Sequence, residues 1–321
     1  MAKFTAVQNP FTGTTAPAGV TMQEVSLDIN TFPLSGVNIT TYGLRAFPTT
    51  LSGNLPRIMF VRGGTTGAGN ALDDDLWDFM DDFAAFGDTT LDAGSGYMVY
   101  APLLRGAIAQ YTSGGTSGGT DEWCGADLWD LANWWSTAKE TGVSDADTYG
   151  AGSTGGIVGM SAGAARVMCA LAQNKVMADA VVLRSPLIDI RSWDEFKAMP
   201  GNTASTQDTL TAMIPSWTSA SDTDYADLTS YEQNQLQARS VVNFIDRLPT
   251  DTKYLFQVAE EDGTIDFNGV KHVLDKMVDK GLKVDMDLIT AAGHGFSTTD
   301  DEAASSASMR KFFGRHLRLA R

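Results

Sequence analysis

A serine stands between two glycines in the stretch GGIVGMSAGAARVM (155–168). Its core, GMSAG (159–163), matches G-x-S-x-G, with an apolar strand-like run before it and small helix-forming residues after it. In such a strand–turn–helix the serine hydroxyl is exposed above the end of a sheet, and the glycines leave room for the adjoining backbone. Tight strand–helix crossings favour small residues for other reasons too. The pattern alone therefore leaves a nucleophilic Ser161 and an ordinary turn equally open.

A nucleophilic serine needs a base, and the chain has three histidines. His272 lies in VKHVLDKMVDKG, which is predicted to be the body of a helix, and His316 lies in the basic C-terminal segment RKFFGRHLRLAR. His294, in AAGHGF, follows the strand-like run KVDMDLIT and is flanked by glycines. A loop directly after a parallel strand lies at the sheet edge where α/β proteins place their sites. Position and elimination both predict His294 as the base.

A carboxylate is needed to orient the histidine, at the end of a strand that lies between serine and histidine in the chain. The segment KYLFQVAEEDGTID (253–266) offers four acidic residues just past such a strand. Asp262 is favoured because Gly263 and then an apolar residue follow it, and Asp266 is the second choice. Glu260 and Glu261 are predicted to be solvated.

Attack on a carbonyl also needs backbone amides aimed at the developing oxyanion. One is expected from Ala162, the residue after the nucleophile, and the other from the glycine-rich loop VRGGTTG (61–67), where Gly64 is our choice. A plain glycine-rich turn would explain that loop if it stood alone. It stands with a serine turn, an acidic turn and a glycine-flanked histidine in consistent order, which favours a nucleophilic serine.

The elements that position these residues alternate along the chain. Strands are predicted at 24–29, 38–47, 57–63, 96–103, 155–160, 178–190, 253–259 and 283–290. Helices are predicted at 72–86, 127–140, 162–175 and 267–281, and from about 300 onward. Such alternation predicts a mostly parallel central sheet flanked by helices on both faces.

Two segments depart from this alternation. Residues 1–20 are rich in Thr, Ala, Gly and Pro and are predicted to be an irregular leader before a single domain at 21–321. Residues 191–248 contain short helical pieces with many apolar and aromatic side chains. We expect them to form an inserted helical cap above the sheet edge that carries Ser161.

The order Ser161, Asp262, His294 is that of the α/β-hydrolases. The chain resembles this superfamily, and within it the prolyl-oligopeptidase and dienelactone-hydrolase-like branch, over roughly residues 55–320. The segments that carry the resemblance are VRGG, YAPLLRG, GMSAG, ARSVVNFIDRLP, EDGTI and AGHGF.

The resemblance implies an α/β-hydrolase fold and a serine hydrolase that uses no metal and no organic cofactor. It assigns Ser161, Asp262 and His294 to the catalytic triad and the amides of Ala162 and Gly64 to the oxyanion hole. Arg62 stands where many relatives have His or Tyr. The sequence before the core does not include the long propeller domain of the oligopeptidases, so the expected activity is hydrolysis of small carboxylic esters.

Two alternatives stay open: an exopeptidase or amidase that uses the same three residues, and a non-catalytic binding protein with the same fold. The net charge of −16, from 39 acidic and 23 basic residues, disfavours nucleic acid and anionic membranes as partners. The two cysteines are too few for a disulfide framework. The chain begins without an apolar signal region and has no run of 18 apolar residues, so we expect a soluble, cytoplasmic protein.

Overall fold

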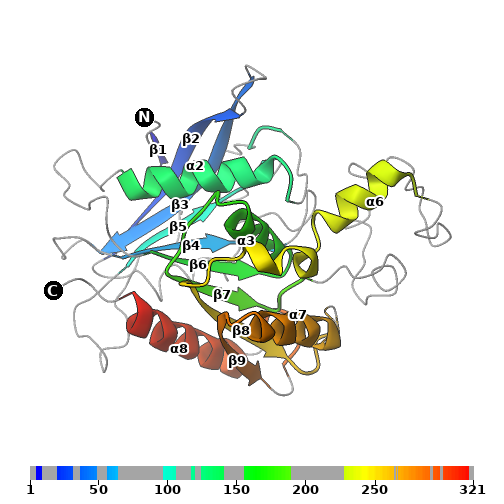
Figure 1. Cartoon of the computed structure of the whole chain (residues 1–321). Helices are drawn as coiled ribbons and strands as arrows, with labels where there is room; N and C mark the ends of the chain where they lie inside the picture. Colours follow the sequence, from blue (N-terminus) through cyan, green and yellow to red (C-terminus); the bar gives the residue numbers. More distant parts are fainter. Residues whose placement is uncertain are drawn as a thin grey trace.

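The computed structural model of the chain describes most of the predicted elements. The described residues are 5–8, 20–31, 37–48, 56–63, 97–105, 117–119, 124–140, 155–188, 228–263, 265, 267–289, 292–296 and 299–317. They form a nine-stranded sheet in the order β1-β2-β3-β5-β4-β6-β7-β8-β9 (Figure 1). The strands are β1 (Thr5–Gln8), β2 (Val20–Thr31), β3 (Val37–Pro48), β4 (Arg57–Val61), β5 (Met98–Pro102), β6 (Gly155–Met160), β7 (Ala180–Arg184), β8 (Lys253–Ala259) and β9 (Lys283–Ile289).

The sheet is parallel from β5 to β9 and antiparallel from β1 to β3, and β3 also pairs antiparallel with β5. All eight predicted strands are present. The prediction of an irregular segment over residues 1–20 is wrong for β1, which pairs with β2 through a register shift. Backbone pairing with an available strand edge satisfies N–H and C=O groups without an apolar pattern, and for that reason nothing in the residue types predicts this strand.

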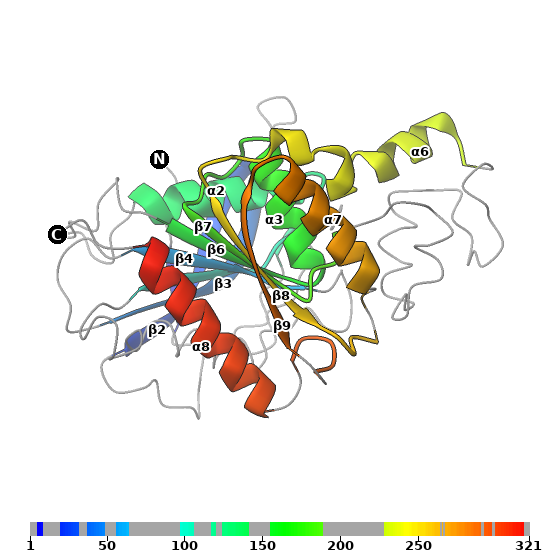
Figure 2. The same cartoon turned by 60° about the horizontal axis from the view of Figure 1, so that its bottom comes forward.

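Helices cover both faces of the sheet, as the alternation predicted (Figure 2). On one face lie α2 (Asp127–Glu140), α3 (Ala162–Ala172) and α7 (Phe267–Asp279), and on the other lies α8 (Thr299–His316). Neighbouring residues of the central strands alternate between two buried clusters. In β6, Ile157 belongs to the cluster with α2 and α3, and Val158 to the cluster with α8. Strands buried on both faces explain why the central runs are apolar throughout.

The predicted cap lies only partly within the described residues. Residues 228–248 contain α6 (Ser230–Gln237) and two short 3-10 turns, Val241–Asn243 and Ile245–Arg247. Helix α6 begins with a capping box, in which Thr229 and Glu232 each accept from the other's backbone N–H. Residues 191–227 lie outside the described part of the chain, as does the predicted helix at 72–86. The division into leader, domain and cap stays a prediction.

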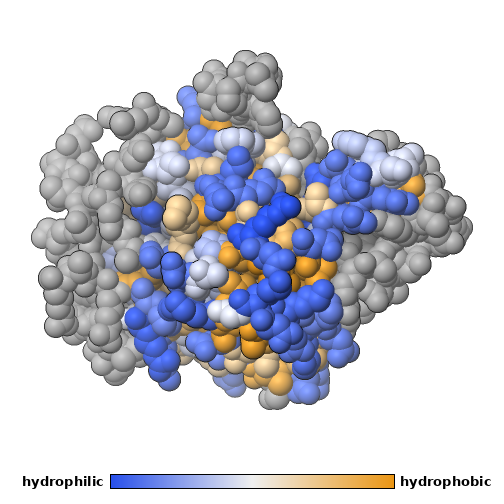
Figure 3. All heavy atoms as spheres, in the orientation of Figure 1, coloured by the Kyte–Doolittle hydropathy of each residue, from blue (hydrophilic) through white to orange (hydrophobic). Residues whose placement is uncertain are grey.

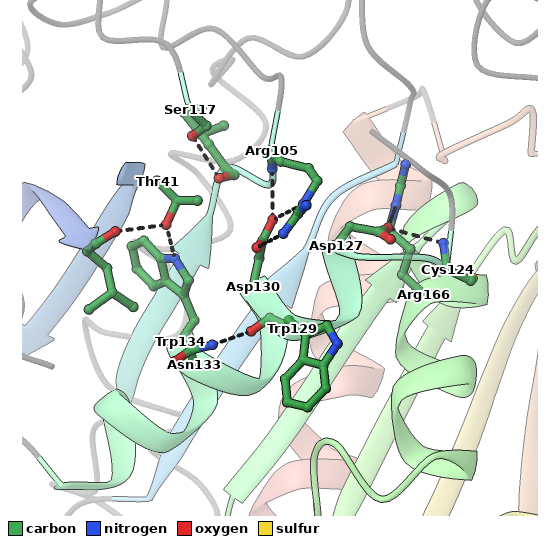
Figure 4. Close-up of polar contacts among 12 residues, drawn as sticks. Thr41, Arg105, Ser117, Cys124, Asp127, Trp129, Asp130, Asn133, Trp134 and Arg166 are labelled. Atoms are coloured by element: carbon green, nitrogen blue, oxygen red, sulfur yellow. Dashed lines mark hydrogen bonds and ion pairs between the residues drawn. The ribbon is translucent and has the colours of Figure 1, made fainter. Parts of the chain in front are cut away.

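Buried ion pairs connect α2 to its neighbours (Figure 4). The Arg105 side chain donates to both carboxylate oxygens of Asp130, at 3.0 and 2.7 Å, and the Arg105 amide donates to Oδ2 at 3.1 Å. Asp127 accepts from Arg166 of α3 at 2.9 Å and from the amide of Cys124 at 3.2 Å. Burial raises the pKa of Asp130 to about 6, although Arg105 acts to lower it. The first turn of α2 is thereby fixed to the segment after β5 and to α3.

We expect Asp130→Ala to lower the free energy of unfolding by about 3–5 kcal/mol, the usual cost of removing one partner from a buried pair. The substitution removes three hydrogen bonds from Arg105, whose side chain is 8% exposed. Urea unfolding measures the loss. Asp275→Ala is the control, because Asp275 forms an exposed pair with Lys271 one helical turn away, and such pairs contribute about 0.3–0.5 kcal/mol. Equal losses in the two variants would contradict a structural role for the buried pair.

The described surface carries few large apolar side chains. Those that are exposed lie in the turn before β7, on α6, on α7 and, as neighbours on one face, on β9: Met177, Tyr231, Val278, Met286 and Leu288. Figure 3 shows hydrophilic residues over much of α6 and α7. Within the described ranges, no helix has both the length and the apolar character needed to span a bilayer.

Candidate active site

Three of the predicted residues follow three parallel strands that lie on one side of the sheet's centre. Ser161 follows β6, Asp262 lies in the turn after β8, and His294 lies in the loop after β9. Parallel strands have their carboxyl ends at the same edge of the sheet, so these turns converge there. The residues are far apart in the chain and close together in space because the strand order places β6, β7, β8 and β9 side by side.

Ser161 occupies the sharp turn between β6 and α3. Its backbone has φ 51° and ψ −121°, a conformation that non-glycine residues rarely adopt. The Ser161 amide donates to the carbonyl of Arg184 at 2.9 Å, and its carbonyl accepts from Ala164 and Leu187. These bonds hold the strained backbone in place, and the side chain remains partly accessible. This is the geometry expected of a nucleophile turn.

The second glycine of GMSAG, Gly163, lies where the structure has no room for a side chain. A Cβ at this position would lie 2.1 Å from the carbonyl oxygen of Val61 and 2.4 Å from that of Arg62, both of which are backbone atoms. Helix α3 therefore begins in direct contact with the end of β4. Only glycine permits that approach without movement of one of the two elements.

His294 contacts both of its predicted partners. Its Nε2 lies 3.2 Å from Oγ of Ser161, and its Nδ1 lies 2.9 Å from Oδ2 and 3.2 Å from Oδ1 of Asp262. When Nδ1 carries the ring proton, Asp262 accepts a hydrogen bond from Nδ1–H, and Nε2 is free to accept the serine proton. The side chain of Asp262 is 2% exposed and that of His294 is 27% exposed. The carboxylate is thus shielded, and the imidazole faces the accessible side.

Asp262 is also fixed by its own turn. Its Oδ1 accepts from the amide of Ile265 at 2.9 Å, and Ile265 is itself buried. Glu260 and Glu261 are exposed, as predicted, and Asp266 lies outside the described residues. Among the described acidic candidates, the structure brings Asp262 to the histidine.

The other two histidines lie within helices. His272 is in α7, and His316 is the last residue of α8. Burial lowers the pKa of His316, and the neighbouring Lys253 acts in the same direction. The imidazole in hydrogen-bond range of Ser161 is that of His294.

The proposed oxyanion site is described in part. Ala162 is the first residue of α3, and amides of a first helical turn have no acceptor within the helix. Gly64 lies outside the described residues. The preceding Gly63 is described and lies against Ser161, since a Cβ there would be 2.8 Å from Cβ of Ser161. The described start of the loop after β4 therefore reaches Ser161.

Sequence reasoning did not identify Ser185, which directly follows β7. Its Oγ accepts from the amide of Gly295, the neighbour of His294, at 3.2 Å. The only signal in the sequence is its place at a strand end, a place it shares with many residues. Within the described part of the chain, no three His, Cys, Asp or Glu side chains are grouped to hold a metal ion.

A mostly parallel sheet with helices on both faces, and a serine turn, an acid turn and a histidine loop at its carboxyl edge, defines an α/β-hydrolase. Solved structures have the same fold. A puromycin-hydrolysing peptidase from Mycobacterium tuberculosis is 17% identical with a TM-score of 0.61, over 91% of this chain and 40% of its own. A Pyrococcus horikoshii acylaminoacyl peptidase is 16% identical (TM-score 0.62), over 94% and 42%. A thermostable esterase from Pseudomonas putida is 17% identical (TM-score 0.61), over 94% and 85%.

The chain belongs to the prolyl oligopeptidase family, whose sequence model matches residues 89–320. The predicted fold class and family are thus confirmed. The chain spans less than half the length of these two peptidases. No curated protein sequence matches it. Membership of the family supports a serine hydrolase, of either the esterase or the peptidase kind.

Proposed function

We propose that the protein is a serine hydrolase that cleaves small carboxylic esters through an acyl-enzyme on Ser161. The observation that carries the proposal is the position of the His294 imidazole. It lies 3.2 Å from the Ser161 hydroxyl on one side and 2.9 Å from the Asp262 carboxylate on the other. A base in hydrogen-bond range of the nucleophile on one side and of an orienting acid on the other is the arrangement that acyl transfer requires.

In the acylation step, Oγ of Ser161 attacks the ester carbonyl while Nε2 of His294 takes the hydroxyl proton. The carbonyl oxygen becomes an oxyanion, which the amides of Ala162 and Gly64 would stabilise. The tetrahedral intermediate then expels the alcohol, which leaves with the proton from His294. The acyl group stays on Ser161 as an ester.

In the deacylation step, His294 takes a proton from water as the water oxygen attacks the acyl-enzyme. Collapse of the second intermediate releases the carboxylic acid and returns the proton to Ser161. In both steps the Asp262 carboxylate accepts a hydrogen bond from Nδ1–H and, while it stays ionised, stabilises the imidazolium. Its 2% exposure keeps water from competing for that hydrogen bond.

The esterase assignment draws on the P. putida esterase, which matches over 85% of its own length. The sequence of residues 191–248 adds to it, since ligand pockets are lined mainly by apolar and aromatic side chains. Part of this segment lies outside the described residues, so the pocket is inferred from sequence. The second candidate is an exopeptidase, favoured by the family match and by the peptidases of similar fold.

A panel of p-nitrophenyl esters and aminoacyl-p-nitroanilides tests the choice of substrate. If a cap forms an apolar acyl pocket, kcat/KM should rise about fourfold per methylene over the first few carbons, from about 0.8 kcal/mol for each buried CH2. It should then fall when the pocket is full.

Anilides hydrolysed faster than every ester would replace the esterase proposal with the peptidase one. Ser161→Ala serves as the blank for each substrate. If the folded wild-type protein cleaves nothing and does not react with a fluorophosphonate, the protein is a non-catalytic member of the fold.

A single domain at 21–321 and a cytoplasmic location remain predictions.

A further inference from the structure

The residues that follow β7 contact both the nucleophile turn and the histidine loop. The carbonyl of Arg184 accepts from the amide of Ser161 at 2.9 Å, and the amide of Leu187 donates to the carbonyl of Ser161 at 3.1 Å. Between these two contacts, Oγ of Ser185 accepts from the amide of Gly295 at 3.2 Å. One short segment therefore holds the backbone on both sides of the Ser161–His294 contact.

Ser185 is itself held rigidly. It is 1% exposed, and its amide donates to the carbonyl of Gln257 in β8 at 2.9 Å. Its φ of 38° is positive, which is uncommon for a residue with a side chain. A hydroxyl fixed in this way is a defined acceptor and not a mobile surface group.

The histidine loop needs such an acceptor because its own backbone is strained. Gly295 and Phe296, directly after the histidine, have φ values of 77° and 61°. Phe296 is 1% exposed, and the Arg184 guanidinium lies 5.2 Å from the centre of its ring. Arg184 also donates to Glu302 of α8 at 2.6 Å. The ring packing fixes the end of the described loop, and the Ser185 hydroxyl fixes the amide next to His294.

We propose that Ser185 is a positioning residue for the reaction, which sets the place of His294 relative to Ser161 through the Gly295 amide. The inference rests on the proposed function, since it assigns a role within that same site. The Ser185 hydroxyl bonds the loop backbone and takes no part in the proton transfer, so its effect is transmitted through the loop. Misplacement of a reacting group by about 1 Å costs on the order of 100-fold in rate, so a lost tether should be visible in kinetics.

The test uses a fluorophosphonate probe, which reacts with an activated serine whatever the natural substrate is. Ser185→Ala should lower the labelling rate at saturating probe by about 10- to 100-fold and leave the half-saturating probe concentration within about twofold. A purely structural role would not produce this division, because the folded fraction would label at the wild-type rate.

Ser117→Ala is the matched control. Ser117 is also 1% exposed, and its Oγ also accepts from a backbone amide, that of Tyr42, at 3.0 Å. The same Oγ donates to the carbonyl of Leu103, so these contacts tie it to β3 and to the end of β5, not to the histidine loop. We expect Ser117→Ala and Ser185→Ala to lose similar thermal stability, with only Ser185→Ala slow to label. Equal slowing in both variants would overturn the proposal.

Ser185→Gly separates positioning from backbone strain. Glycine tolerates a φ of 38° and also lacks the hydroxyl, so the variant should fold and label as slowly as Ser185→Ala. Wild-type labelling in either Ser185 variant overturns the proposal, and so does a Ser185→Gly protein that fails to fold while Ser117→Ala folds. Failure of the proposed function is distinguishable, since the folded wild-type protein would then not be labelled, or Ser161→Ala would still be labelled.

Discussion

Replacing Ser161 with alanine is expected to lower kcat by about four orders of magnitude or more while the protein stays folded. The substitution removes the attacking oxygen, Oγ of Ser161, which lies 3.2 Å from Nε2 of His294. His294 then has no hydroxyl from which to take a proton. What remains is binding and oxyanion stabilisation. Ester hydrolysis by purified variants, with circular dichroism to show folding, measures the effect.

The three residues are expected to act as a unit. His294→Ala should be about as damaging as Ser161→Ala, and the double variant little worse than either, because both remove one shared proton transfer. Asp262→Asn should also lower kcat severely. The Asp262 carboxylate lies 2.9 Å from Nδ1 of His294 and favours the tautomer with the proton on Nδ1, and an amide in its place would no longer do so. Additive losses in the double variant would contradict the shared step. If Asp266→Asn lowers kcat more than Asp262→Asn does, Asp266 and not Asp262 is the orienting acid.

Gly163→Ala is expected to destabilise the protein strongly, although it adds a single methyl group. The new Cβ would meet two backbone carbonyl oxygens, at 2.1 and 2.4 Å, and neither belongs to a side chain that could rotate away. Overpacking ordinarily costs about 1–3 kcal/mol, and we expect a loss at or above the upper end of that range. Because α3 must move away from β4, the fluorophosphonate labelling rate of Ser161 should fall as well.

Two other glycines provide the controls for that substitution. A Cβ at Gly263 or at Gly281 meets nothing within 4 Å, but only Gly281 has a positive φ, of 75°. Gly281→Ala should cost about 1–2 kcal/mol from backbone strain alone, and Gly263→Ala should be nearly neutral in urea unfolding. A Gly163→Ala loss no larger than that of Gly281→Ala would show that the contact with β4 relaxes easily.

The sheet and the three central residues could be predicted from the sequence for one physical reason. Strands buried on both faces are apolar throughout, so their ends are visible in the sequence, and chemistry in parallel sheets gathers at those ends. Ser161 and Asp262 each follow such a run closely, whereas His294 follows β9, a largely exposed strand at the sheet's edge whose polar and apolar residues alternate. The glycines around Ser161 are visible in the sequence for a second reason, since a close approach of two backbone segments excludes every other residue type.

The interactions between elements were not visible in this way. The stretch 127–140 was predicted as an amphipathic helix, yet Asp127 and Asp130 are fully buried. Their burial depends on Arg166 and Arg105, which no spacing rule links to them. Ser185 was missed because its role depends on the partner that the tertiary fold brings to its hydroxyl. Strand β1 was missed because edge pairing needs backbone alone.

The distance in sequence between Ser161 and His294 has a consequence for biosynthesis. Ser161 and His294 are 133 residues apart, and β9 with its loop must pair before the two can meet. At about 5–20 residues per second, a ribosome needs roughly 7–27 s to cover that interval. Throughout that time the nascent chain contains Ser161 without His294. Under the proposed function, Ser161 is therefore inert during this interval, and it becomes reactive only after β9 and the loop that carries His294 have emerged and paired.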